Sequence, residues 1–157
     1  QFGNLLKLKR LNLRTNQLTG NVPSELGNLS NLEILLLNSN SLTGELPIDL
    51  GNLSSIQQMD FTLNQLSGSI PVFLGNLTSL TYLSLYGNQL TGIIPQELGN
   101  LTNLKNLVLG NNNLTGEIPP QIYNLTELLE LNMFSTNITG LIPPEIGNLT
   151  KLVFLRL

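Results

Sequence analysis

Apolar residues recur along the whole chain with a period of 24 residues, and no insertion or deletion interrupts the period. Within each repeat, two apolar positions are separated by one variable residue, as in Leu35-Leu36-Leu37. This alternation predicts a short strand with one buried face, and its equivalents lie at 11–13, 83–85 and 107–109. A period of 20–50 residues is typical of a solenoid, whose units stack in one direction. Seven positions are apolar in every complete repeat, and in the first they are Leu8, Leu11, Leu13, Leu18, Val22, Leu26 and Leu29.

Columns of single residue types accompany the apolar pattern. A glycine recurs from Gly20 to Gly140 and a proline from Pro23 to Pro143, each at intervals of 24 residues. Glycine permits a turn, and proline blocks a helix or a central strand. An asparagine three residues after each strand predicts a structural ladder, because a buried amide can bond backbone groups on both sides of a turn. The ladder consists of Asn16, Asn40, Asn64, Asn88 and Asn112, and it is expected to weaken at Thr136 in the sixth repeat.

The consensus Leu-x-x-Leu-x-Leu-x-x-Asn-x-Leu, which covers nearly the whole chain, resembles the leucine-rich repeat family. Its continuation, Leu-Thr-Gly-x-Ile-Pro-x-x-Leu-Gly-Asn-Leu, is similar to the plant-specific class. The resemblance implies an α/β solenoid, a right-handed superhelix with a parallel β-sheet on the concave side. It also implies short 3₁₀ or helical segments on the convex side and an extra strand around Leu-Thr-Gly-x-Ile-Pro.

We predict a single leucine-rich repeat array at residues 1–157, without caps. Its complete units are 8–31, 32–55, 56–79, 80–103, 104–127 and 128–151, with partial units at 1–7 and 152–157. Natural solenoids end in atypical capping repeats, and in the resembled family these usually carry cysteine pairs, whereas this chain has no cysteine. The expectation is therefore that the 157 residues are cut from a longer array.

The variable strand positions are predicted to face the concave side, because alternate residues of a strand point to opposite faces. Tyr82 and Tyr86 share one strand, and Val108 and Phe134 continue diagonally across the next two. Strands lie about 4.8 Å apart, so these four side chains are expected to form one apolar patch. Aromatic residues are enriched at binding hot spots, although scattered exposed apolar side chains also occur without a function. The candidate ligand-binding residues are Tyr82, Tyr86, Val108, Phe134, Asp60 and Glu130.

Eight Asn-x-Ser/Thr sequences are candidate N-glycosylation sites, which would require a secreted protein. Six of them form a column, and a full column of glycans would be crowded. We therefore interpret the column as a structural feature whose asparagines bond the backbone between units, with partial glycan occupancy as a consequence. The sites are Asn28, Asn52, Asn76, Asn100, Asn113, Asn124, Asn137 and Asn148.

Composition argues against catalysis and against nucleic-acid binding. The chain contains no histidine and no cysteine, which excludes His-based triads and thiol nucleophiles. Glu127 and Glu130 are three residues apart and are interpreted as a solvated surface pair. The net charge of −3 gives no attraction to nucleic acid. We expect no catalytic residues, no metal and no cofactor.

The resemblance implies an extracellular recognition segment of a plant receptor-like kinase or receptor-like protein, at the outer face of the plasma membrane or in the cell wall. A peptide, a small hormone or a protein ligand would bind the concave face, and a co-receptor ectodomain would dock alongside. The first alternative is a secreted inhibitor of cell-wall-degrading enzymes that resembles the polygalacturonase-inhibiting proteins. The second is a structural or designed array without a ligand.

Overall fold

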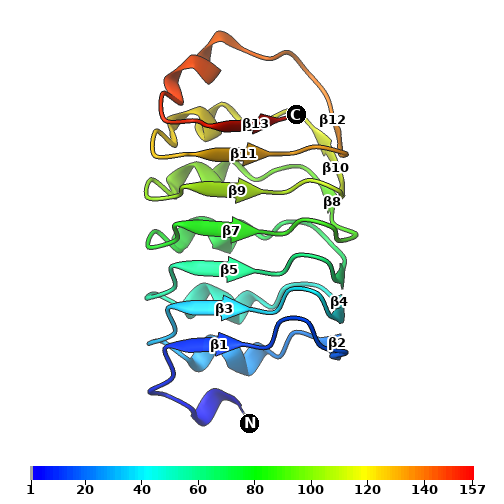
Figure 1. Cartoon of the computed structure of the whole chain (residues 1–157), viewed down its shortest axis with the longest axis vertical. Helices are drawn as coiled ribbons and strands as arrows, with labels where there is room; N and C mark the ends of the chain where they lie inside the picture. Colours follow the sequence, from blue (N-terminus) through cyan, green and yellow to red (C-terminus); the bar gives the residue numbers. More distant parts are fainter. Residues whose placement is uncertain (1) are drawn as a thin grey trace.

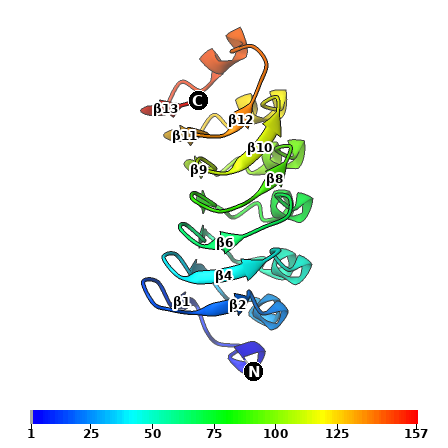
Figure 2. The same ribbon diagram turned by 90° about the vertical axis from the view of Figure 1, so that its right-hand side faces the viewer.

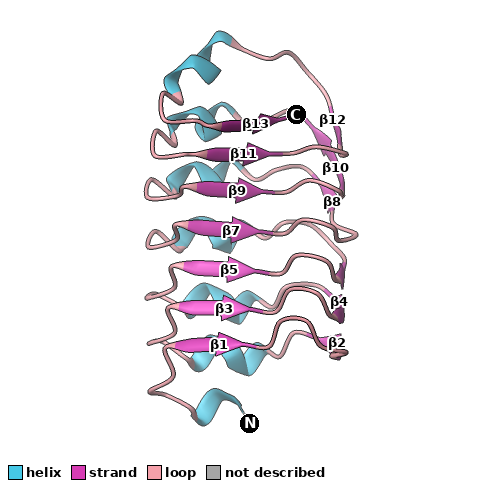
Figure 3. Cartoon of the chain, in the orientation of Figure 1, coloured by secondary structure: helices cyan, strands magenta, loops and turns pink. Residues whose placement is uncertain are grey.

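The computed structural model describes residues 2–157, in which each complete repeat forms two short strands followed by one 3₁₀ helix (Figures 1 and 3). The first strands of the repeats are β1 (Arg10–Asn12), β3 (Ile34–Leu36), β5 (Gln58–Asp60), β7 (Tyr82–Ser84), β9 (Asn106–Val108), β11 (Glu130–Asn132) and β13 (Phe154–Arg156). The second strands are β2 (Thr19–Asn21), β4 (Ser41–Gly44), β6 (Gln65–Leu66), β8 (Thr91–Gly92), β10 (Asn113–Gly116) and β12 (Asn137–Ile138). The 3₁₀ helices are η1 (Phe2–Asn4), η2 (Ser24–Asn28), η3 (Ile48–Asn52), η4 (Val72–Asn76), η5 (Gln96–Asn100), η6 (Pro120–Asn124) and η7 (Pro144–Asn148).

The first strands form one parallel sheet in the order β1-β3-β5-β7-β9-β11-β13. Each residue lies beside its equivalent in the next repeat, as Leu35 lies beside Met59 and Met59 beside Leu83. These central residues are fully buried, whereas Gln58 beside Met59 is exposed. The alternation of apolar and variable residues therefore selects which face of the sheet is buried.

The second strands form two three-stranded parallel sheets, β2-β4-β6 and β8-β10-β12, on the flank of the stack. Between β6 and β8 the ladder is reduced to an isolated bridge of Ser69 with Thr91 and to backbone bonds such as Gln89 N to Leu66 O at 2.8 Å. The glycine that follows each Leu-Thr or Leu-Ser pair has a positive φ angle, +74° at Gly44 and +80° at Gly68. A side chain is strained in this left-handed region, which explains the glycine column.

The 3₁₀ helices form the convex side. A proline in extended conformation precedes η2 to η5 and η7, as at Pro47 with φ −67° and ψ 138°. The helix closes with a bond from the Leu53 N–H to the Leu50 carbonyl oxygen, 3.2 Å long. Leu50 and Leu53 are fully buried, so each short helix anchors its repeat to the core through leucines.

Figure 2 shows the stack bowed, with the first-strand sheet on the inside of the curve and the helices on the outside. A continuous apolar core lies between the two sides and extends from Leu11 to Leu149. The wider helical side and the closely spaced strands together produce the curvature. The expected leucine-rich repeat solenoid, with a concave parallel sheet, convex 3₁₀ segments and an extra strand, is confirmed.

Candidate ligand-binding surface

Strand pairing in register arranges the concave side chains in rows. The strands β5, β7, β9 and β11 place Tyr82 between Gln58 and Asn106, with Glu130 one strand further on. The turn after the strands continues the grid, because hydrogen bonds link Leu63 N to Tyr86 O and Asn111 N to Phe134 O. The candidate residues therefore occupy one continuous surface over four neighbouring strands.

Tyr82 is half-buried in the middle of this surface. Burial raises the pKa of its hydroxyl, and the carboxylate of Asp60 on the adjacent strand raises that pKa further. Glu130 adds a smaller effect in the same direction, and its Oε2 accepts a 3.0 Å hydrogen bond from Asn106 Nδ2. The Tyr82 hydroxyl is consequently protonated at neutral pH and lies in a negative potential.

Val108 does not project as the sequence suggested. Its side chain is only 8% exposed, whereas Phe134 on the neighbouring repeat is 54% exposed. Val108 therefore contributes to the floor of the surface. The raised part of the predicted patch consists of Tyr82, Tyr86 and Phe134.

Polar residues that the sequence analysis did not single out hold the floor in place. Thr62 Oγ1 and Ser84 Oγ are 2.6 Å apart, and Ser84 is 1% exposed. Asn132 Oδ1 accepts a hydrogen bond of 3.2 Å from the Phe134 N–H and thereby fixes the backbone under the aromatic ring. These small polar residues stand at variable positions, and nothing in the repeat pattern marks them as hydrogen-bonded. Their partners are either 22 residues away or on the backbone, so the sequence alone did not indicate them.

The ladder asparagines lie at the edge of the same sheet. Asn64 Nδ2 donates to the carbonyl oxygens of Leu37 and Phe61, both at 3.0 Å, and Asn64 Oδ1 accepts from the Leu42 N–H at 3.0 Å. Asn40, Asn88 and Asn112 make equivalent bonds to the preceding repeat. Within the described chain, the Asn16 side chain bonds only its own turn, through Leu13 O and Arg14 O, while its backbone N–H donates to Ser39 O at 3.2 Å.

Thr136 interrupts the ladder. Its hydroxyl donates to the Met133 carbonyl oxygen at 2.8 Å, and it has no amide oxygen to accept from the Leu114 N–H. A polar hollow of about 220 Å³ lies at this break. Its lining consists of Asn88, Asn111, Asn112, Asn113, Ser135, Thr136 and Asn137.

All eight asparagines of the Asn-x-Ser/Thr sequences are exposed. The proposed backbone-bonding role of the column Asn28, Asn52, Asn76, Asn100, Asn124 and Asn148 is wrong for the side chains, which make no hydrogen bond with residues 2–157. The turn is instead satisfied by its own backbone, as in the bond from Ser30 N to Asn28 O at 3.0 Å. Because these side chains are exposed, N-glycosylation of the column, and of Asn113 and Asn137, stays a prediction.

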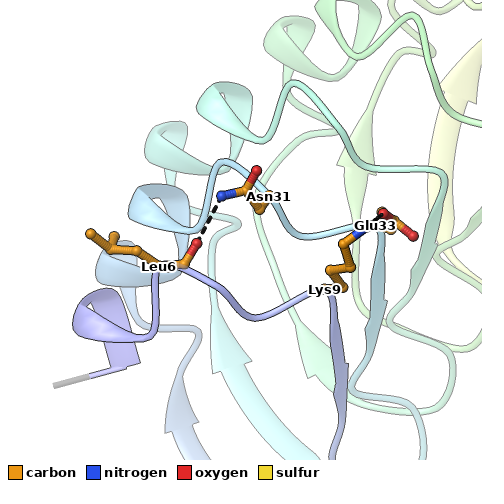
Figure 4. Close-up of polar contacts among 4 residues, drawn as sticks. All are labelled: Leu6, Lys9, Asn31 and Glu33. Atoms are coloured by element: carbon orange, nitrogen blue, oxygen red, sulfur yellow. Dashed lines mark hydrogen bonds and ion pairs between the residues drawn. The ribbon is translucent and has the colours of Figure 1, made fainter.

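Contacts at the N-terminal end of the stack bind neighbouring repeats on the side where the strands begin. Lys9 Nζ lies 2.7 Å from Glu33 Oε1, and Asn31 Nδ2 donates to Leu6 O at 2.8 Å. Figure 4 shows the positions of these four residues. The Lys9 ammonium lowers the pKa of the Glu33 carboxyl through this bond. Lys151 and Glu127 form the same kind of pair at the other end, at 2.7 Å. Glu127 is thus an ion-pair partner rather than part of an acidic couple with Glu130.

The described residues contain no group of three or more carboxylate, histidine or cysteine side chains that is arranged to hold a metal ion. None of the helices within residues 2–157 has the length and apolarity that a membrane crossing requires.

Comparison with known proteins identifies the repeat. A family model described as a leucine-rich repeat region matches residues 1–114, and a leucine-rich repeat model matches residues 127–149. A comparison with curated protein sequences found no match.

Solved structures of plant receptors have the same fold. The ectodomain of the Arabidopsis thaliana receptor kinase GASSHO1/SCHENGEN3, in complex with CASPARIAN STRIP INTEGRITY FACTOR 2, is 39% identical with a TM-score of 0.96 over 98% of this chain. The plant peptide hormone receptor RGFR1 in complex with RGF2 is 38% identical with a TM-score of 0.97 over 99%. The Arabidopsis receptor kinase HAESA, in complex with the peptide hormone IDA and the co-receptor SERK1, is 34% identical with a TM-score of 0.88 over 99%.

This chain spans 19%, 25% and 30% of those three proteins respectively, so it corresponds to a part of their repeat arrays. The family model covers well over half of the 157 residues, and the apolar columns explain why it does. The chain therefore belongs to the leucine-rich repeat family and matches its plant receptor-like members.

Proposed function

We propose that this chain is a segment of an extracellular plant receptor that recognises a peptide ligand on its concave face. The observation that carries the proposal is the surface formed by half-buried Tyr82 and Tyr86 on the fourth repeat and exposed Phe134 on the sixth, with Val108 of the fifth repeat between them. Aromatic side chains supply a large contact area at low conformational cost, and they are anchored here by a rigid sheet. The solved relatives that bind peptide hormones support the choice of a peptide.

The charges around the aromatic residues favour a peptide with a basic group. Asp60 and Glu130 flank Tyr82 and both raise the pKa of its hydroxyl, so their negative potentials overlap at this ring. A lysine or arginine of the ligand would be attracted to the carboxylates and to the face of the ring. Within the described chain, neither carboxylate forms an ion pair.

A co-receptor ectodomain is proposed as a second partner, by analogy with the complex of HAESA with SERK1. The proposed role is recognition and not catalysis, because the leucine-rich repeat ectodomain fold is generally non-catalytic. Signal transmission would belong to other parts of the whole protein.

The test is to screen the chain against a panel of secreted plant peptides by isothermal titration calorimetry and to repeat any binding with Phe134→Ala. Because Phe134 is 54% exposed, its truncation should change stability little and should weaken the affinity for the ligand at least tenfold. Val72→Ala is the matched control, because Val72 is 61% exposed on the convex side. Equal binding by Phe134→Ala and wild type, or no peptide bound at millimolar concentration, would overturn the proposal.

A further inference from the structure

The fifth repeat breaks a glycine column on the convex side. Gly27, Gly75 and Gly99 each lie so close to the next repeat that a Cβ there would overlap it, and at Gly75 the overlap is with the Glu97 carbonyl oxygen. The equivalent residue of the fifth repeat is Tyr123, which has both a Cβ and a large ring. The sixth repeat therefore cannot approach the fifth at this point as closely as the repeats that follow Gly27, Gly75 and Gly99 approach those glycines, whereas the junction at Gly51 is looser, because a Cβ there would lie 3.3 Å from Phe73.

A hollow of about 550 Å³ lies at this place, between the fifth and sixth repeats. Its walls are mostly apolar, and two carboxylates stand among them. The lining consists of Glu117, Ile118, Pro120, Tyr123, Gly140, Leu141, Pro143 and Glu145.

Tyr123 is the buried polar residue of this hollow. The residue as a whole is only 2% exposed. Its hydroxyl oxygen forms no side-chain hydrogen bond within residues 2–157, and it is not among the fully buried atoms that lack a partner, so it remains accessible from the hollow that Tyr123 lines. Burial raises the pKa of the hydroxyl, and the carboxylate of Glu145 raises it further. A protonated hydroxyl without a partner inside the protein has a free donor and free acceptor capacity on the side of the hollow.

The hollow lacks positive charge. The second-strand and helical segments, 17–28 and its five equivalents, contain six acidic residues and neither lysine nor arginine. Both Glu117 and Glu145 are without an ion-pair partner among residues 2–157. The whole excess of negative charge therefore lies on the convex flank, because the seven basic residues are all in other segments.

We propose that the hollow beside Tyr123 binds a basic side chain, arginine or lysine, of a partner protein. The apolar walls accommodate the aliphatic stem, Glu117 and Glu145 neutralise the cation, and the Tyr123 oxygen accepts a hydrogen bond from it. The ring and the prolines also provide surfaces on which a guanidinium group stacks well. The site is on the flank away from the concave face, and it is independent of the peptide proposed there.

The first test uses N-acetylarginine amide as the probe and follows the Tyr123 ring and the Gly140 and Leu141 amide signals by NMR. The expected result is saturable shifts in the millimolar range. N-acetylcitrulline amide, which is nearly isosteric but neutral, should shift these signals at least fivefold less at equal concentration. Equal shifts with the two compounds would overturn the proposal, because the hollow would then be only an apolar cavity.

Matched charge variants identify the carboxylates. The double variant Glu117→Gln/Glu145→Gln should lower the affinity for N-acetylarginine amide at least fivefold. The control Glu45→Gln/Glu97→Gln changes the net charge equally at the same columns of other repeats and should leave the affinity unchanged. Equal weakening by both pairs would show a general charge effect and contradict the site. Tyr123→Phe keeps the ring, and its expected effect is a two- to fivefold weakening from the loss of the hydroxyl.

The source of the cation is tested with the peptide acetyl-Gly-Gly-Arg-Gly-Gly-amide. A site for a partner's side chain should bind this peptide at least as tightly as the single amino-acid compound, because the side chain enters from a continuous backbone. If the peptide binds at least fivefold more weakly than N-acetylarginine amide, the proposal of a protein partner is wrong. The concave variant Phe134→Ala should leave all of these measurements unchanged.

Discussion

The junction around Asn64 and the junction around Thr136 are built from the same repeat but differ in how completely they are closed. At Asn64, one side chain bonds two carbonyl oxygens and one buried N–H, and the backbone N–H of Asn64 reaches Gly87 O at 3.3 Å. At Thr136, one hydroxyl bonds one carbonyl oxygen, and a polar hollow lies beside it.

The convex side shows the same contrast. Gly75 allows close approach of the next repeat, whereas Tyr123 separates the fifth and sixth repeats and lines a hollow. Residues that follow the columns thus join neighbouring repeats closely, and a residue that departs from a column leaves a hollow at the surface. In a nearly regular array, the departures are therefore the places where a particular partner can be distinguished.

The largest effect is expected for Asn64→Ala. The change leaves the Leu42 N–H and the Leu37 and Phe61 carbonyl oxygens without their side-chain partner inside the protein. Unsatisfied buried groups cost about 1–3 kcal/mol each, so the free energy of unfolding should fall by about 4 kcal/mol. Urea denaturation followed by circular dichroism measures this change. Thr136→Ala is the control and should cost about 1 kcal/mol; similar losses for the two variants would remove the contrast between the junctions.

Gly75→Ala should have an intermediate effect. The new Cβ meets the backbone of Glu97, which cannot move aside as a flexible side chain would. Overpacking of this kind costs about 1–3 kcal/mol, whereas Gly147→Ala should change stability by less than about 0.5 kcal/mol. The control is suitable because a Cβ at Gly147 has no atom within 4 Å. Thermal denaturation of both variants provides the comparison, and equal melting temperatures would show that the glycine column is not required for close stacking.

The smallest effect is expected for Thr136→Asn, which restores the ladder. An amide at this position can accept from the Leu114 N–H, and one such bond contributes about 1 kcal/mol. Hydrogen exchange measured by NMR should slow at Leu114 more than at Leu42, which already has its Asn64 partner. Exchange at Leu114 as fast as in the wild-type chain would mean that the added amide does not complete the ladder.

The concave strands and the turns were predicted from columns of one residue type, whereas the extra strands and the convex 3₁₀ segments were expected from the resemblance to the plant-specific leucine-rich repeats. Leu35, Gly44 and Pro47 act locally, through burial, a positive φ angle and a fixed φ angle, so their roles can be inferred from spacing alone. The exposure of Val108 could not be predicted, because it depends on the size of side chains from neighbouring repeats. The role given to the Asn28 column was wrong because the turn already bonds its own backbone.

The period and the apolar columns by themselves determined that the chain stacks as a leucine-rich repeat solenoid with a variable concave face. A fixed period requires each residue to meet its own equivalent, so the register of the whole stack was already determined. Only the tertiary structure decided which variable side chains are exposed and that the charge of Asp60 acts on the Tyr82 hydroxyl. It also decided that a hollow lies beside Tyr123 and Glu145. Those properties depend on distances between side chains of different repeats, and no single repeat contains them.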